Sequence, residues 1–121
     1  MQMAKVDSFR FGLIVIDGKK YVRDVLVFPD GTMRKRKGGF WKFGSHTIKR
    51  EEIDQLVKAD PEEIIVGTGT SAKARLTPDT ESWANEAKLN LVVLSSQEAV
   101  ERFNRLVQEG KRVAALIHIT C

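Results

Sequence analysis

The chain has 121 residues, of which 42% are hydrophobic and 30% charged, and this profile predicts one compact domain spanning residues 1–121. Its longest apolar run is far below the roughly 18 residues that a membrane span needs, and the polar start does not fit a secretory signal. One cysteine cannot close a disulfide within the chain, which favours a reducing, cytoplasmic location. The cysteine and the two histidines lack the spacing of a zinc site, so no metal and no cofactor is expected.

The net charge of +4 is concentrated in one segment. Residues 30–50 carry seven basic and one acidic side chain, whereas residues 51–121 carry eight basic and twelve acidic ones. A protein that binds nucleic acid more often carries basic residues along a whole face. The distribution therefore makes nucleic acid an unfavoured partner.

The first 45 or so residues are typical of β-structure. Strands are predicted over Phe9–Ile16 and Tyr21–Phe28, and each run ends at an Asp-Gly pair, which is a strong turn signal. The next stretch, Met33–Phe43, fits either a strand or an exposed loop, and the sequence leaves both open.

From residue 47 onward, helical and strand patterns alternate. The expected elements are a helix through Ile53 and Val57, a buried strand Glu63–Gly67, a helix starting at Thr77-Pro78, a buried strand Leu91–Leu94, a helix capped by Ser95 and stopped by Gly110, and a last strand Val113–Ile119. The order α-β-α-β-α-β after a β-rich unit predicts an α/β sandwich whose helices cover a central sheet, with the N-terminal β-hairpin unit on one side.

The first candidate site is the turn after the first buried strand. Ligands of open α/β sheets sit beyond the carboxyl ends of strands, where glycines allow backbone amides to approach an anion. Arg75, and with it Lys73, could add positive charge there, although the turn lacks a complete nucleotide-binding motif and also fits a plain tight turn. The candidate ligand-binding residues are Gly67, Thr68, Gly69, Thr70, Ser71, Arg75 and His118.

The second candidate is a basic and aromatic stretch. Alternating cations and rings can follow a phosphate backbone while bases stack on the rings, so a nucleic-acid accessory role is one hypothesis. The same cations are also typical of a solvated sheet edge or of a surface for an acidic protein partner. The residues concerned are Arg34, Lys35, Arg36, Lys37, Trp41 and Lys42.

The third candidate is the C-terminal tail, where His118 and Cys121 could serve as base and nucleophile. They would belong to an enzyme whose pocket lies between the Gly67–Ser71 turn and the terminal strand. Three residues apart on a strand, however, they point to opposite faces unless the end of the strand bends. The sequence therefore identifies no catalytic residue.

These segments together resemble the Mth-type domain family, which includes an adipogenesis-associated domain protein and a mitochondrial complex I assembly factor. The resemblance is carried by Ile16–Tyr21 with Asp24-Val25, Pro29–Gly31, Ile65–Gly69 followed by Thr77-Pro78, Glu98–Gly110, and Val113–Cys121 with its His118-x-Thr120-Cys121 ending. It implies a three-layer fold with a central mixed sheet. It also implies a binding or assembly role, because the family has no established catalytic activity.

The leading hypothesis is therefore a small non-catalytic protein that binds a protein partner or a small anionic ligand. The enzyme and the nucleic-acid accessory protein are the alternatives. Neither the oligomeric state nor the identity of the partner follows from the sequence.

Overall fold

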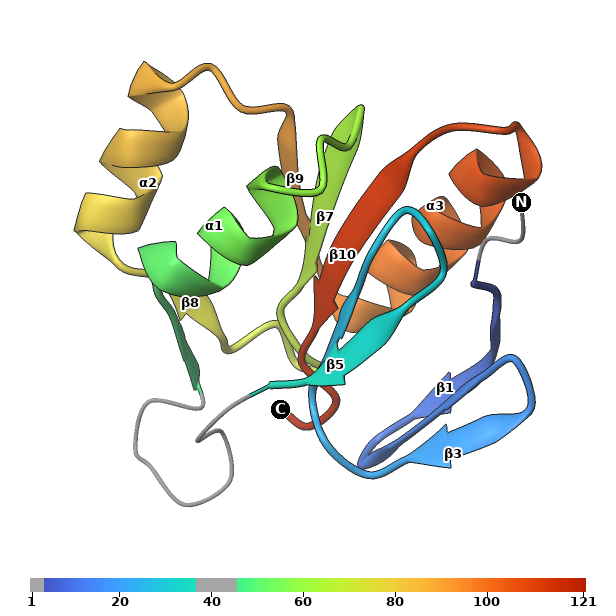
Figure 1. Ribbon diagram of the computed structural model, residues 1–121. Coiled ribbons are helices and arrows are strands. Elements are labelled where there is room, and N and C mark those ends of the chain that lie inside the picture. Colours follow the sequence, from blue (N-terminus) through green and yellow to red (C-terminus); the bar gives the residue numbers. More distant parts are fainter. Residues whose placement is uncertain (1–3, 37–45) are drawn as a thin grey trace.

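The computed structural model describes residues 4–36 and 46–121, and it forms a central sheet between two outer layers (Figure 1). The strands are β1 (Val6–Arg10), β2 (Leu13–Ile16), β3 (Lys19–Tyr21), β4 (Val25–Val27), β5 (Met33–Lys35), β6 (Thr47–Ile48), β7 (Glu63–Gly67), β8 (Arg75–Leu76), β9 (Leu91–Leu94) and β10 (Val113–Ile117). The helices are α1 (Arg50–Val57), α2 (Pro78–Glu86) and α3 (Ser96–Gln108). The expected α/β three-layer architecture is confirmed.

The central sheet has five strands in the order β5-β4-β10-β7-β9. Strands β10, β7 and β9 run parallel to one another, while β4 pairs antiparallel with both β10 and β5, so the sheet is mixed. Every residue of β7 and β10 is buried, as expected of strands covered on both faces. Strand β9 ends the sheet on one side and has no further strand beyond it within the described ranges.

Two apolar cores lie on opposite faces of this sheet. One face packs against α3 and against a three-stranded antiparallel sheet of β1, β2 and β3, with Phe103 only 2% exposed at its centre. The other face packs against α1 and α2, with Ile53 and Leu56 fully buried beneath α1. Figure 1 shows the same separation, with α1 and α2 on one side of β7 and β10 and α3 on the other.

The predicted helix starts are confirmed. The Thr77 side chain caps α2 by accepting a hydrogen bond from Thr80 N at 3.1 Å, and Pro78 occupies the first turn. Ser95 caps α3, because its hydroxyl accepts from Glu98 N at 3.3 Å and donates to the Glu98 carboxylate at 2.9 Å. These caps align both helices with the ends of the strands that precede them.

Two of the predicted strands are wrong in extent. The run Phe9–Ile16 is divided by a turn at Phe11 and Gly12, so that β1 and β2 pair as a hairpin. The run Tyr21–Phe28 is divided as well, because the Asp24 carboxylate faces inward and accepts a hydrogen bond from Ile119 N at 2.9 Å. The N-terminal unit is therefore a three-stranded sheet, and β4 belongs to the central sheet.

The stretch left open by the sequence begins as strand β5 and continues to the buried Arg36, and its part from residue 37 onward lies outside the described residues. A parallel pair, β6 with β8, was not anticipated and joins the entry of α1 to the entry of α2. No helix in the described parts of the chain is long and apolar enough to cross a membrane.

Candidate functional site

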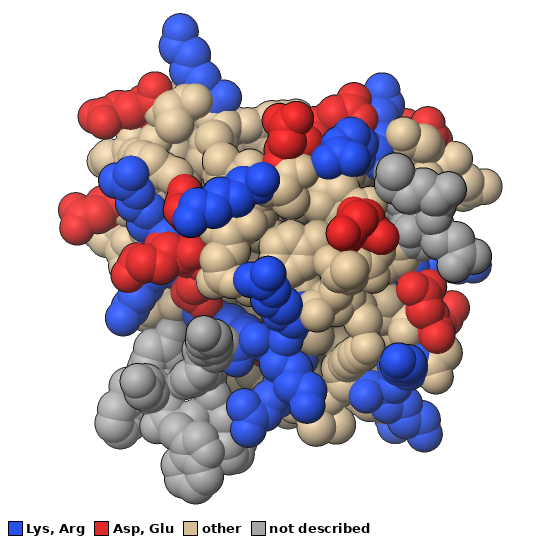
Figure 2. Space-filling view, viewed as in Figure 1, with Lys and Arg blue, Asp and Glu red and all other residues tan. Residues whose placement is uncertain are grey.

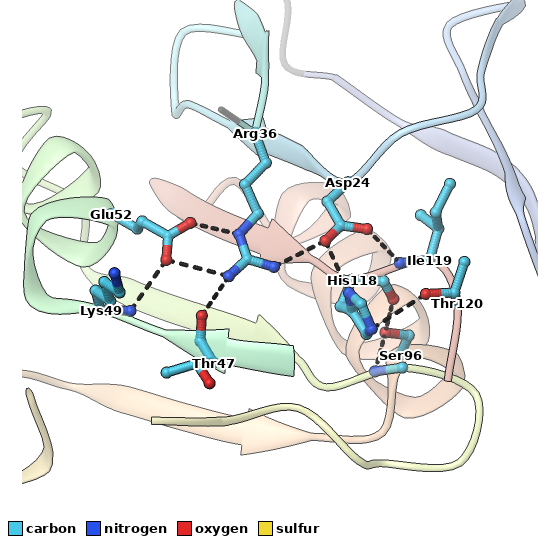
Figure 3. A network of polar contacts seen from close by, with 10 residues as sticks. Asp24, Arg36, Thr47, Lys49, Glu52, Ser96, His118, Ile119 and Thr120 are labelled. Atoms are coloured by element: carbon cyan, nitrogen blue, oxygen red, sulfur yellow. Dashed lines mark hydrogen bonds and ion pairs between the residues drawn. The ribbon is translucent and has the colours of Figure 1, made fainter. Parts of the chain in front are cut away.

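A buried polar network joins the end of β10 to β4, β5 and α1 (Figure 3). Asp24 is its centre, with Oδ2 accepting from His118 Nδ1 at 2.7 Å and from Arg36 Nη1 at 2.8 Å. The Arg36 guanidinium also forms a bidentate ion pair with Glu52, and its Nη2 donates to the Thr47 carbonyl at 2.6 Å. In the described part of the chain, every buried polar side-chain atom has a hydrogen-bond partner.

The pKa values of this network are set by opposing effects. Burial by itself raises the pKa of Asp24, but hydrogen bonds from His118, Ile119 and Arg36 outweigh it and leave the pKa below its ordinary value of 3.8. Burial lowers the pKa of Arg36, and its bonds to Glu52 and Asp24 more than compensate, so that pKa is raised. Both groups therefore remain charged at neutral pH.

The candidate turn Gly67–Ser71 uses its backbone donors within the fold. Thr68 N donates to Leu94 O at 2.9 Å, Gly69 N to Ser96 Oγ at 2.8 Å, and Thr70 N to Thr120 O at 2.7 Å. A backbone N–H that already has a partner cannot bind an anion without losing that bond. The turn thus anchors α3 and the C-terminal tail through these three amides, and the anion site expected at the turn stays a prediction.

The two glycines of the turn are required by close packing. A Cβ on Gly67 would lie 2.8 Å from Ser96 Oγ, so a side chain there would push the start of α3 away. Gly69 has a φ of +107°, and a Cβ on it would lie 2.4 Å from the carbonyl carbon of Cys121. The tail therefore fills the space between the turn and the terminal strand, where the enzyme hypothesis expected a pocket.

The groups proposed as reactive do not converge. His118 is only 1% exposed, its Nδ1 is bound to Asp24, and its Nε2 lies 3.2 Å from Thr120 Oγ1. Its backbone carbonyl accepts from Ser96 Oγ at 2.5 Å. Cys121 is half-buried, and its carbonyl accepts from Lys73 N at 2.9 Å. In this structure the His118 side chain holds the Asp24 network together, and its role as a ligand-binding residue stays a prediction.

The basic stretch is divided by the structure. Arg34 and Lys35 are exposed on β5, whereas Arg36 is 4% exposed and neutralised by two carboxylates. Arg36 cannot bind a phosphate or an external partner while it holds that position. Lys37, Trp41 and Lys42 lie outside the described residues.

Sequence reasoning missed Asp24, Glu52 and Ser96 as members of a common network. Their partners are distant in the chain, since Asp24 and His118 are 94 residues apart and Ser96 and His118 are 22 apart. The one local signal was an aspartate inside an apolar β-run, because aspartate is depleted in strands unless it has a special role.

One surface cleft lies where the candidate ligand site was expected, beyond the carboxyl ends of β7 and β9. It is a cavity of about 420 Å³, here called the β9 cleft. Of the predicted residues, Thr68 and Arg75 line it. The other lining residues are Ala72, Ala74, Leu76, Glu81, Val93, Leu94, Ser95 and Glu98.

Charges in the β9 cleft are mixed and accessible. Arg75, Glu81 and Glu98 are exposed, and the Arg75 side chain makes no hydrogen bond or ion pair with any other described residue. Val93 contributes an apolar wall and is 46% exposed. No group of three or more His, Cys, Asp or Glu side chains poised to hold a metal ion occurs in residues 4–36 and 46–121.

A protein-family model and several solved structures match this chain. The family model described as "Protein of unknown function (DUF498/DUF598)" matches residues 6–118. A solved structure named MT938 is 31% identical, with a TM-score of 0.81 over 98% of this chain and 99% of its own.

Two further structures have the same fold. A conserved hypothetical protein from Pyrococcus horikoshii OT3 is 29% identical, with a TM-score of 0.78 over 97% of this chain and 99% of its own. A Bordetella pertussis protein described as an Mth938-like domain is 18% identical, with a TM-score of 0.69 over 95% of this chain and 85% of its own. At that identity the last likeness concerns the fold alone.

Proposed function

Since the chain belongs to the family described as "Protein of unknown function (DUF498/DUF598)", its role must be argued from its own geometry, and we propose a non-catalytic binding protein. The partner is an extended segment of another protein, which adds to the sheet along strand β9 and lies in the β9 cleft. This is an accessory or assembly role of the kind expected from the sequence.

The observation that carries the proposal is the edge of β9, beyond which residues 4–36 and 46–121 place no further strand. Asn90 O accepts from Ile64 N at 2.9 Å and Leu94 O accepts from Thr68 N at 2.9 Å, so these carbonyls face β7. Residues of a parallel strand direct their backbone groups alternately to one neighbour and the other. Val93 therefore directs its N–H and C=O away from β7, to the side on which the sheet ends.

An added strand would satisfy both backbone groups of Val93 and cover its side chain. Strand addition of this kind supplies affinity through main-chain hydrogen bonds and specificity through side-chain pockets. The β9 cleft beside the edge offers Arg75 for a carboxylate of the segment and Glu81 and Glu98 for a basic group. A peptide can present all these features at once, whereas a simple anion would meet two carboxylates.

Binding is favoured over catalysis by the positions of the reactive side chains. His118 is buried in the Asp24 network and does not line the β9 cleft. A general base must lie within hydrogen-bond reach of its substrate, directly or through one water. The cleft itself holds hydroxyls and carboxylates whose hydrogen bonds cap α3, as with Ser95 and Glu98.

The proposal can be tested by selecting short linear peptides on the immobilised chain and mapping their contacts by backbone amide NMR. Peptides that bind along β9 should shift the amides of Val93 and its neighbours. Val93→Pro should weaken their binding about tenfold or more, because it removes the outward N–H, and proline is tolerated at such edge positions. Val93→Ala keeps the N–H and should stay within about threefold of the wild type.

Two outcomes would overturn this role. The first is that the selected peptides map to another surface and bind Val93→Pro as well as the wild type, while the variant keeps its melting temperature. Alternatively, light scattering could show a dimer that Val93→Pro dissociates, in which case a second copy of this chain occupies the edge and no separate partner is needed. If Val93→Pro unfolds the protein, Val93→Lys gives the same test, because a lysine on an edge strand opposes pairing with another strand.

A further inference from the structure

A second pocket, separate from the β9 cleft, lies between the β4–β5 hairpin and the end of α1. It is a cavity of about 340 Å³, here called the basic pocket because Arg34, Lys58 and Arg112 line it. Phe28, Asp30 and Gln55 are also among its lining residues. Figure 2 shows basic side chains gathered in the middle of this face, where Figure 1 places the hairpin beside α1.

The two arginines of this pocket are held by neutral groups. Arg34 Nη1 donates to Gln55 Oε1 at 3.3 Å, and its guanidinium carbon lies 5.0 Å from the centre of the Phe28 ring. Arg112 Nη2 donates to Ala59 O at 2.8 Å, and its Nε to Asp60 O at 3.3 Å. These contacts fix the positions of the guanidinium groups without pairing either of them with a carboxylate in the described part of the chain.

The contrast with the other ordered arginines is direct. Arg36 is paired with Asp24 and Glu52, and Arg102 is paired with Glu63 through bonds of 2.5 and 2.8 Å. Within the described ranges, neither Arg34 nor Arg112 lies within ion-pair distance of a carboxylate.

The acidic groups near the basic pocket form no ion pair with its two arginines in the described ranges, although Glu62 Oε2 accepts from the backbone N–H of Arg112 at 2.7 Å and Asp30 attracts Arg112 at longer range. Asp30 accepts from the hydroxyl of Thr32 at 2.7 Å and from its N–H at 2.9 Å, which fastens the turn between β4 and β5. Lys58 lies 3.5 Å from Asp54, and both side chains are exposed, so this pair is weak and open to exchange. Three cations thus face one carboxylate across the cavity.

We propose that the basic pocket binds a small molecule carrying a phosphate or diphosphate group. Arg34 of β5 and Arg112 at the start of β10 donate to the phosphate oxygens, and the exposed Lys58 adds a third cation. Preorganised guanidinium groups are well suited to phosphate, because their N–H pairs match its oxygens. This inference is independent of the role proposed for β9.

The test is a titration of the full chain with inorganic pyrophosphate at low ionic strength, followed by amide NMR and calorimetry. Shifts should concentrate on the β4–β5 hairpin, the end of α1 and residue 112. Arg34→Gln should weaken binding about tenfold, since charge-assisted hydrogen bonds are lost. Rising salt should weaken it further, as for any partly exposed charge pair.

Two matched variants separate a built site from general attraction to a basic protein. Arg105→Gln removes one exposed positive charge from α3, outside the lining of both cavities, and should leave pyrophosphate affinity within about twofold. Asp30→Asn keeps an acceptor oxygen for Thr32 and removes the one carboxylate facing the cavity, so it should tighten binding about threefold.

The proposal is overturned if millimolar pyrophosphate shifts no amide around the basic pocket. It is equally overturned if Arg34→Gln and Arg105→Gln weaken binding to the same extent, since the attraction would then belong to net charge alone. Because Arg34 is exposed and on a strand surface, its replacement leaves the fold intact. Should a single-stranded RNA compete at far lower concentration than pyrophosphate, the small-molecule assignment fails as well.

Discussion

Replacing Asp24 with asparagine keeps the shape of the side chain and removes the charge at the centre of the buried network. The carboxylate accepts from His118 Nδ1, Arg36 Nη1 and Ile119 N at 2.7, 2.8 and 2.9 Å. Asparagine has one acceptor oxygen, so its NH₂ group must face at least one of these donors. Removing one partner of a buried ion pair costs about 3–5 kcal/mol. We expect Asp24→Asn to lower the free energy of unfolding by about that amount at neutral pH.

The pH dependence of this loss tests its electrostatic origin. Because burial is outweighed by hydrogen bonds, the pKa of Asp24 is lower in the folded protein than its ordinary value of 3.8. The charge of Asp24 therefore stabilises the fold above a pH of about 4, and this contribution is lost as the pH falls through the folded-state pKa. The difference between wild type and Asp24→Asn should narrow below a pH of about 4.

Urea unfolding of both proteins at neutral and acidic pH measures this difference directly. Asp54→Asn is the matched control, because Asp54 pairs only with the exposed Lys58 at 3.5 Å and should cost at most about 1 kcal/mol. The reasoning is refuted if Asp24→Asn costs no more than Asp54→Asn, or if its cost is the same at both pH values.

Three further substitutions probe the packing around the network. Gly69→Ala should lower the free energy of unfolding in urea by about 2–4 kcal/mol, because φ is +107° and the new Cβ would lie 2.4 Å from Cys121. If the same substitution costs as much in a chain that lacks the last two residues, the clash is not the cause. Ser95→Ala removes the cap of α3 and should cost about 0.5–2 kcal/mol, measured by thermal unfolding. Phe103→Ala should cost about 3–5 kcal/mol, whereas Phe11→Ala, at a side chain 60% exposed, should be nearly neutral in the same assay.

Local patterns account for the parts of the fold that were predicted correctly. Helix α3 combines a Ser95 cap, a buried face through Phe103 and a stop at Gly110, and each of these signals lies within one or two helical turns. Strand β7 was predicted with its observed bounds, because an unbroken apolar run ending in glycine needs no distant information. The family resemblance also rests on contiguous segments of sequence, and the family model and the structure of MT938 confirm it.

The polar network could not be predicted because its geometry is not local. Arg36 stands in a row of four cations, a pattern typical of a solvated surface, and its carboxylate partners lie 12 and 16 residues away. The candidate turn shows the same limit. Its glycines were correctly recognised as places of close backbone approach, but the group that approaches is the chain's own tail. Identical sequence features therefore serve ligand binding or internal packing, and only the tertiary contacts decide between them.

Some arginines of the described residues are paired with a carboxylate, whereas others line a cavity without such a pair. Arg36 follows β5 and bonds to Glu52 of α1 and to the Thr47 carbonyl. It therefore connects the two described segments of the chain, residues 4–36 and 46–121. A buried charge of this kind stabilises one arrangement of the layers and is not available to a ligand. Arg34, Arg75 and Arg112 have no such partner within the described residues, and each lines a cavity. Removing a carboxylate partner of Arg36 should lower the free energy of unfolding, whereas replacing Arg34 or Arg75 should lower ligand affinity alone. Measuring both quantities on the same variants therefore separates the two kinds of arginine.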